Sequence, residues 1–183
     1  MNGEHGTIHS VAAPVTEHCD RGAGQYELAV HAPEVAAGAA PGQFAHLRCG
    51  PHLPMRRPLS LLDAEPASGE VRFLYKVVGE GTAELARREV GETVGVLGPI
   101  GVPFTVPETA TRPLLLGGGV GIPPVQFLAR RLAQQGRPAA AFLGSEVPFP
   151  FAEQPATLPL KGAEGRAQGA DHAHAELESW GVA

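Results

Sequence analysis

The chain has 183 residues, of which 43% are hydrophobic and 18% are charged, and its formal net charge at pH 7 is −5. This length allows one large domain or two small ones, and the hydrophobic content suffices for a packed core. The acidic balance and the lack of a large basic cluster exclude nucleic acid as an expected partner. No apolar run approaches the roughly 20 residues of a membrane span.

The N-terminal residues do not have the charged and then apolar pattern of a signal peptide. Two cysteines, Cys19 and Cys49, are too few for a disulfide framework. A reducing cytoplasm is therefore the expected location, and both thiols are expected to be inert.

The first half of the chain shows the pattern of short strands separated by glycine and proline turns. Residues 1–23 are mostly polar and aperiodic, and their beginning is expected to fray. Residues 33–42 form an expected loop, and Thr82 is a plausible N-cap for a brief helix over 83–88. Short strands are expected at 26–30, 43–48, 59–62, 71–78 and 93–97, with the third and fourth forming a hairpin. Short strands with little helix predict a small antiparallel barrel.

After a linker at 103–111, the hydrophobic period changes from two to 3.6, as in an α/β unit. Leu114, Leu115 and Leu116 form an apolar run that suits a buried strand and is too short for a helix. Glycines 117, 118, 119 and 121 follow, and Pro123 or Pro124 then suits a first helical turn. The helix stripe consists of Val125, Leu128, Ala129 and Leu132, with Gly136 placed to end the helix.

A strand, a glycine turn and a helix in this order bind phosphate, because unpaired N–H groups and the helix dipole point at one place. The dinucleotide fingerprint G-x-G-x-x-G is not satisfied, since its last position would be Ile122 or Pro124. The alternative is a tight turn without a ligand, but four glycines in five residues exceed what such a turn needs.

Residues 138–144 are a plausible second parallel strand. Residues 148–169 show no clear period, and 173–180 fit one short helix. The expected organisation is an antiparallel β-barrel over residues 1–107 and an incomplete Rossmann-like α/β domain over 112–183.

A second candidate site is the segment Arg57, Pro58, Leu59 and Ser60. An arginine and a hydroxyl on a strand that leaves a proline loop can hold a phosphate and a ring edge. A surface arginine and an ordinary strand serine give the same pattern, so this segment alone is weak evidence.

The order R-x-x-S, strand, G-x-G-T, L-G-P-x-G and GGGxGxxP resembles the ferredoxin-reductase superfamily. A more specific resemblance is to the family of electron-transfer subunits of bacterial NAD-dependent dihydroorotate dehydrogenases. It rests on the segments RRPLSLL, LYKVVGEGT, VLGPIG and LLLGGGVGIPP. The resemblance covers residues 20 to 150. It implies an FAD-binding barrel, a nicotinamide-binding α/β domain, and a catalytic dihydroorotate dehydrogenase subunit as partner in pyrimidine biosynthesis.

Carried over by motif, the resemblance assigns three groups of residues to cofactors. The flavin and its phosphates would contact Arg57, Pro58, Leu59 and Ser60. The isoalloxazine or ribityl region would meet Leu74, Tyr75 and Lys76, and the pyrophosphate would meet Gly81 and Thr82. The NAD(H) pyrophosphate would approach Gly117, Gly118, Gly119 and Gly121.

The sequence departs from this family at its C-terminal side. The family holds a [2Fe–2S] cluster with four cysteines, and no cysteine follows Cys49 here. From Leu114 onward 70 residues remain, whereas a doubly wound domain usually has five or six strands. The chain is therefore expected to be truncated, with electron transfer through a cluster in doubt.

Three functions stay open: an electron-transfer subunit, a stand-alone NAD(P)H-dependent flavin or ferredoxin reductase, and an inactive fragment that keeps the FAD barrel. The chain is expected to be an oxidoreductase component that is not catalytic without its partner. Glu146 follows the second α/β strand, where an acid favours the ribose hydroxyl of NAD, so NADH is expected over NADPH. His172 and His174 have no cysteine or fixed scaffold nearby, so no metal site is expected.

Overall fold

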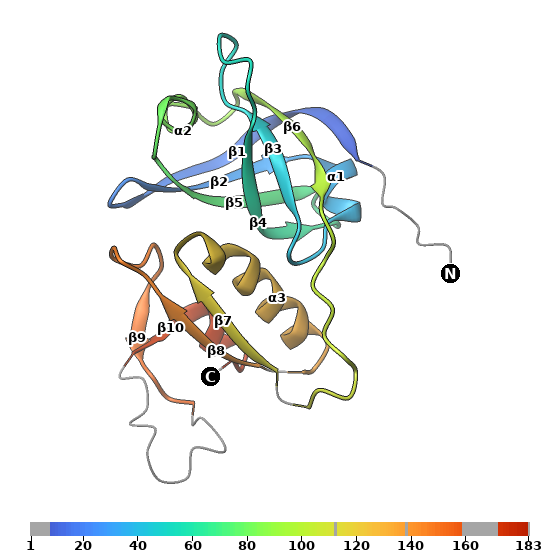
Figure 1. Cartoon of the computed structure of the whole chain (residues 1–183), viewed down its shortest axis with the longest axis vertical. Coiled ribbons are helices and arrows are strands. Elements are labelled where there is room, and N and C mark those ends of the chain that lie inside the picture. The colour runs from blue at the N-terminus through green and yellow to red at the C-terminus, as the bar shows by residue number, and fades with distance from the viewer. Residues whose placement is uncertain (1–7, 112, 138, 159–171, 183) are drawn as a thin grey trace.

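A computed structural model describes residues 8–111, 113–137, 139–158 and 172–182. The chain forms a β-barrel followed by a smaller α/β body that lies against one side of it (Figure 1). No helix in these ranges is long and apolar enough to cross a membrane.

The barrel is closed by six antiparallel strands in the order β1-β2-β5-β4-β3-β6. Closure pairs every strand on both sides and leaves no open sheet edge. The strands are β1 (His9–Gly22), β2 (Gln25–His31), β3 (Phe44–Arg48), β4 (Arg57–Glu65), β5 (Glu70–Lys76) and β6 (Thr93–Ile100). The predicted barrel and its β4–β5 hairpin are confirmed.

Alternating apolar residues fill the barrel interior. Leu28 lies opposite Phe73 and Val30 lies opposite Val71 in the β2–β5 pair, and all four are fully buried. Burying a side chain of this size contributes about 1.5–3 kcal/mol, so these pairs fix the register of the two strands.

Three local expectations in the barrel are wrong. The polar N-terminal stretch contains the longest strand, β1, because its backbone pairs with both β2 and β6 and needs only a few buried side chains, among them Ala13 and Val15. The expected loop at 33–42 begins with helix α1 (Pro33–Gly38), whose Val35 is fully buried. Helix α2 (Glu80–Leu85) starts three residues earlier than expected, with Gly79 rather than Thr82 at the N-cap.

The α/β body is built on two parallel strands, β7 (Leu114–Gly118) and β8 (Ala140–Gly144). A single turn of 3₁₀ helix (Gly119–Gly121) and helix α3 (Ile122–Gln134) connect them, as predicted. Gly136 follows α3 in the left-handed region with φ +69°, which confirms it as the residue that ends the helix. The C-terminal part holds β9 (Glu153–Pro155), β10 (His172–His174) and α4 (Ala175–Ser179).

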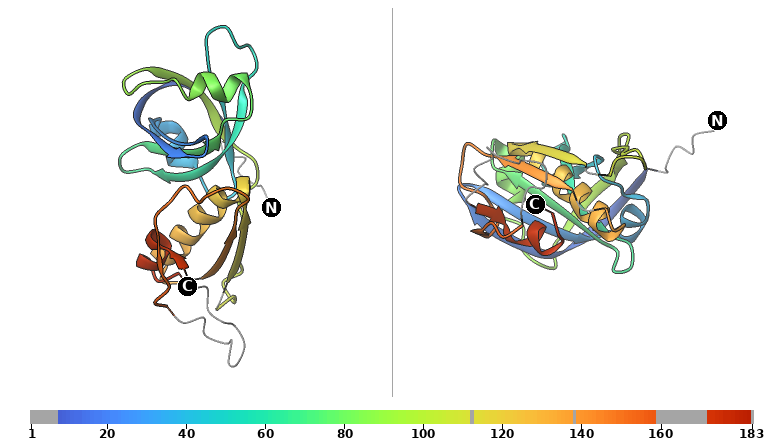
Figure 2. Two further views of the ribbon diagram at one scale, coloured as in Figure 1. Left: turned by 90° about the vertical axis from the view of Figure 1, so that its left-hand side faces the viewer. Right: turned by 90° about the horizontal axis from the view of Figure 1, so that it is seen from below.

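Helix α3 contacts both bodies of the molecule (Figures 1 and 2). Val125, Ala129 and Leu132 pack in one apolar cluster with Leu115 of β7. Phe127, outside the predicted stripe, is fully buried in the apolar cluster of the barrel. The helix therefore joins two cores.

Candidate functional site

The first part of the candidate site lies where β4 begins beside α2. A Cβ added at Gly81 would lie 2.5 Å from Nε of Arg57, so only glycine allows this approach. Nη1 of Arg57 also donates to the Met55 carbonyl at 3.0 Å. The structure thus brings Arg57 to the first turn of α2, although the two lie 24 residues apart in the sequence.

Thr82 uses its hydroxyl within the chain. The hydroxyl oxygen accepts hydrogen bonds from the backbone N–H of Val78 at 3.0 Å and of Gly79 at 3.3 Å, and its proton goes to the Gly79 carbonyl at 3.1 Å. Thr82 is buried. Its side chain shapes the turn before α2 rather than projecting from it.

The expected flavin residues on β4 and β5 divide between two faces. Pro58, Ser60, Leu74 and Lys76 are partly or fully exposed and alternate with the inward positions. Leu59 and Tyr75 pack in or against the barrel core. The structure therefore places four of these residues on the outer face and turns two inward.

Tyr75 belongs to a polar chain inside the barrel. Its hydroxyl lies 2.9 Å from Nε2 of His18, whose Nδ1 lies 2.7 Å from the Arg88 carbonyl oxygen. Tyr26 stacks on the Tyr75 ring at 5.8 Å. Burial raises the pKa of Tyr75, so the phenol stays protonated. The Tyr75 side chain thus points into the barrel, and its expected place along the isoalloxazine or ribityl region stays a prediction.

The second part of the site is the glycine turn between β7 and α3. A Cβ at Gly117 would lie 3.1 Å from Cδ2 of Leu143, so this glycine permits close packing of the two strands. A Cβ at Gly119 or Gly121 would have no heavy atom within 4 Å, and at Gly118 the nearest would be 3.9 Å away. Gly119 also has φ +51°, in the left-handed region. The backbone of three of the four glycines is therefore open to a neighbouring molecule.

Both parallel strands end beside this turn, since Gly118 pairs with Gly144. Glu146 follows Gly144 by two residues and is exposed. The carboxyl edge of a parallel sheet is where α/β proteins bind ligands, and the first N–H groups of α3 add a positive partial charge there. The arrangement suits an anionic group at the turn and a ribose near Glu146.

A cavity of about 580 Å³ lies between the barrel and the α/β body, and sequence reasoning did not find it. Its barrel wall includes Leu62, Arg72 and Leu74, and α3 contributes Gln126 and Arg130. The alternation on β4 and β5 predicts which side chains point out of the barrel. It does not predict that α3 lies opposite them and encloses a cavity.

Arg72 is the most heavily paired cation of this wall. Burial opposes its charge, but hydrogen bonds to Glu27, Glu70 and Glu17 outweigh burial and raise the pKa of the guanidinium. All three contacts are 2.7–2.8 Å long. The guanidinium of Arg72 is therefore already paired with carboxylates of the barrel itself.

The described residues contain no group of three or more histidine, cysteine or acidic side chains placed to hold a metal ion. His172 is exposed, while His174 is buried and its Nδ1 accepts from the N–H groups of Glu176 and Leu177. Cys19 lies in β1 and Cys49 is buried after β3, where burial raises the pKa of its thiol. Two such thiols do not fit a [2Fe–2S] cluster, which needs four soft ligands.

No family model matches the chain. The electron transfer subunit of dihydroorotate dehydrogenase B (NAD(+)) from Shouchella clausii (strain KSM-K16) is 39% identical over 123 residues, which cover 65% of this chain and 48% of that protein. The subunit of the same name from Bacillus caldolyticus is 38% identical with the same coverage. The chain thus spans about half the length of the curated relatives it matches.

Two solved structures show the same fold. The NADH-dependent reduced ferredoxin-NADP oxidoreductase has a TM-score of 0.68 at 32% identity, covering 75% of this chain and 50% of that chain. The ferredoxin reductase in carbazole 1,9a-dioxygenase has a TM-score of 0.68 at 26% identity, covering 77% and 44%. Over about two thirds of its length, the chain is therefore similar in sequence to electron transfer subunits of dihydroorotate dehydrogenase B, and it has the fold of the ferredoxin reductases.

Proposed function

We propose that the chain is an FAD-binding electron-transfer component that passes electrons between NAD(H) and a catalytic dihydroorotate dehydrogenase subunit in pyrimidine biosynthesis. The observation that carries the proposal is the pairing of two sites in one chain. One is the Arg57–Gly81 contact at α2, and the other is the open glycine turn at the carboxyl edge of β7 and β8. The relatives' names support a dihydroorotate dehydrogenase partner, and the pyrimidine pathway is part of the proposal.

The residues of the barrel fit FAD. Arg57 would hold a phosphate by a charge-assisted hydrogen bond, with Gly81 leaving room for the guanidinium. Ser60, Leu74 and Lys76 would lie along the ring and ribityl chain on the outer face of β4 and β5. FAD, when bound, supplies the ability to exchange a hydride with NAD(H) and to release electrons one at a time.

The glycine turn fits the pyrophosphate of NAD(H). The backbone at Gly118, Gly119 and Gly121 admits close approach, and the start of α3 favours negative charge. Glu146 would accept a hydrogen bond from the adenosine ribose and would repel a 2′-phosphate. We therefore propose NADH as the preferred nicotinamide. We also propose the cytoplasm as the site of action, because Cys19 and Cys49 are free thiols, as a reducing compartment favours.

Cys19 and Cys49 do not fit an iron–sulfur cluster. Electrons would leave this chain directly to a partner, or through a cluster whose ligands are supplied by another part of the assembly.

A stand-alone ferredoxin reductase is the second candidate, favoured by two structural neighbours that are reductases at 32% and 26% identity. The apolar face of the described β7–β8 sheet favours a component that works in an assembly, because Leu114, Leu116 and Phe142 are exposed on the face opposite Leu115. A chain that keeps the barrel and lacks nicotinamide activity is the third.

The deciding experiment has three readouts on the purified full chain. Flavin absorbance after gel filtration tests FAD binding, and NADH oxidation with an artificial acceptor tests the nicotinamide site. Co-purification with a flavin-containing dihydroorotate dehydrogenase subunit tests the partner. Loss of added FAD on gel filtration would overturn the proposal, and flavin without NADH oxidation would favour the third candidate.

A further inference from the structure

Strand β4 and helix α3 each carry one half of the proposed site at one end. Arg57 to Ser60 occupy the start of β4, and the glycine turn immediately precedes α3. The two elements pack against each other in the described structure. Their relative angle therefore sets the separation between a flavin on the barrel and a nicotinamide on the α/β body.

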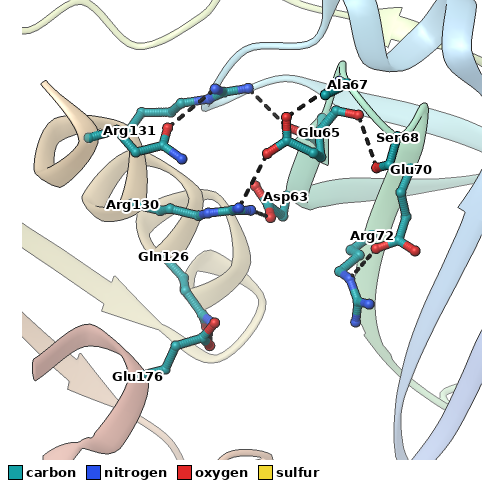
Figure 3. A network of polar contacts seen from close by, with 12 residues as sticks. Asp63, Glu65, Ala67, Ser68, Glu70, Arg72, Gln126, Arg130, Arg131 and Glu176 are labelled. Atoms are coloured by element: carbon teal, nitrogen blue, oxygen red, sulfur yellow. Dashed lines mark hydrogen bonds and ion pairs between the residues drawn. The ribbon is translucent and has the colours of Figure 1, made fainter. Parts of the chain in front are cut away.

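The other ends of these two elements are joined by polar contacts, which Figure 3 shows. The guanidinium of Arg130 forms ion pairs with Asp63 and, at 3.4 Å, with Glu65. Nη2 of Arg131 donates to the Ala64 carbonyl at 2.9 Å. We call these five residues, Asp63, Ala64, Glu65, Arg130 and Arg131, the interdomain clamp.

The Asp63–Arg130 pair is well shielded from water, with side-chain exposures of 16% for Asp63 and 27% for Arg130. Burial lowers the pKa of Arg130, yet a guanidinium remains charged in proteins. Removing one partner of such a pair leaves the other charge poorly solvated, which costs much more than breaking an exposed pair.

The packing between the two bodies is interrupted beside the clamp. The cavity of about 580 Å³ opens beside the clamp, so continuous packing is absent there among the described residues. The linker over 101–113 has no regular secondary structure where it is described. Phe127, buried in the barrel core, and the hydrogen bond from Gln25 to the Pro148 carbonyl are further joints. Phe127 can serve as a pivot for α3 on the barrel, and the clamp then prevents α3 from rotating about this pivot relative to β4.

We propose that Arg130 is a positioning residue that sets the distance between the flavin-binding end of β4 and the glycine turn of α3. This inference rests on the proposed function. The pivot Phe127 lies six residues after Gly121, roughly 9 Å along the helix axis. A rotation of about 6° over that length moves the turn by about 1 Å, a displacement that can cost about 100-fold in rate.

The test compares Arg130→Gln and the nearly isosteric Asp63→Asn with the parent chain. Arg87→Gln is the matched control, since it removes the same charge from a 79%-exposed side chain paired with Glu84. The FAD dissociation constant should stay within about twofold of the parent, because the barrel site lies at the other end of β4. The stopped-flow rate of flavin reduction by NADH should fall tenfold to 100-fold in both clamp variants and stay unchanged in the control.

Hydrogen exchange of the FAD-free proteins provides a readout without activity. The amides of α3 should lose protection in Arg130→Gln and Asp63→Asn, and Arg130→Lys should restore part of both protection and rate. Flavin reduction at the parent rate, or unchanged protection, would overturn the positioning role. If the parent binds no FAD or is not reduced by NADH, the proposed function fails. The protection of the α3 amides then remains the test of whether the clamp holds the helix.

Discussion

Arg57 makes two contacts within the chain that would place it for the proposed phosphate. Its guanidinium lies beside Gly81, and its Nη1 donates to the Met55 carbonyl. Preorganisation of this kind reduces the entropy lost on binding. The energetic weight of the FAD site should therefore rest heavily on this residue.

Arg57→Ala should weaken FAD binding roughly tenfold to 100-fold, because a charge-assisted hydrogen bond contributes about 1.5–3 kcal/mol. Flavin retention on gel filtration and a fluorescence titration would measure the effect. Arg48→Ala, which removes an exposed arginine from β3, is the control. If Arg57→Ala retains flavin as firmly as the parent, Arg57 is not a phosphate ligand.

Gly81→Ala should weaken FAD to a similar degree, since the new Cβ forces Arg57 to move. The double variant Arg57→Ala/Gly81→Ala should bind FAD no more weakly than Arg57→Ala alone, because the second change then has nothing left to displace. Additive losses would show that Gly81 acts on the ligand by itself.

Glu146 gives a prediction on nicotinamide choice. Steady-state rates with the two cofactors should favour NADH, and Glu146→Gln should narrow the difference by relieving repulsion of the 2′-phosphate. A parent chain that prefers NADPH would remove Glu146 from the site.

At the scale of elements, the C-terminal segment is held by a buried histidine at a helix start. Nδ1 of His174 accepts from the N–H groups of Glu176 at 3.2 Å and Leu177 at 3.5 Å, and its ring stacks on Phe151. Nδ1 must be unprotonated to accept these bonds. Burial lowers the pKa of His174 to about 4, which favours the same neutral form.

This pairing predicts acid sensitivity of the α/β body. Because the folded pKa lies below the ordinary value of about 6.5, the unfolded chain binds more protons between these values, and stability falls as pH drops from 6.5 toward 4. Denaturant unfolding followed by Trp180 fluorescence across this range would measure the loss. His174→Gln should flatten the dependence, and His172→Gln, at an exposed position of the same strand, should not. An unchanged slope in His174→Gln would contradict this explanation.

At the scale of the whole molecule, the barrel and the α/β body differ in how far each depends on the other for its packing. The barrel strands close within residues 9–100, and only Phe127 of α3 is added to their buried core, so the proposed FAD site requires little from the second body. The α/β body has two parallel strands and depends on α3 and on its contact with the barrel.

The purified chain should therefore be a yellow protein with flavin absorbance, without iron and without acid-labile sulfide. Cys19 and Cys49 supply two thiols at most, and both lie in the barrel half. A visible spectrum, iron analysis and a sulfide assay would check this. Stoichiometric iron would contradict this prediction. The ligands to examine would then be Cys19 and Cys49 from each of two chains, which could together hold one cluster.

Local periodicity determined much of this molecule from the sequence alone. Strands β3 and β5 lie where their alternation predicts, since each has one buried face. Helix α3 lies where its stripe predicts, although Phe127 buries a second face in the barrel core. The glycine turn was also readable, because four glycines in five residues have a steric meaning that does not depend on the rest of the fold.

Tertiary structure alone decided the features that depend on distant partners. Strand β1 is stabilised by backbone pairing with β2 and β6, and its mostly polar side chains show no pattern that predicts a strand. Tyr75 turns inward to meet His18, 57 residues away, and Arg130 meets Asp63 across the two bodies. Periodicity states which side of an element is buried, but not against which neighbour, because that choice is made by the packing of the whole chain.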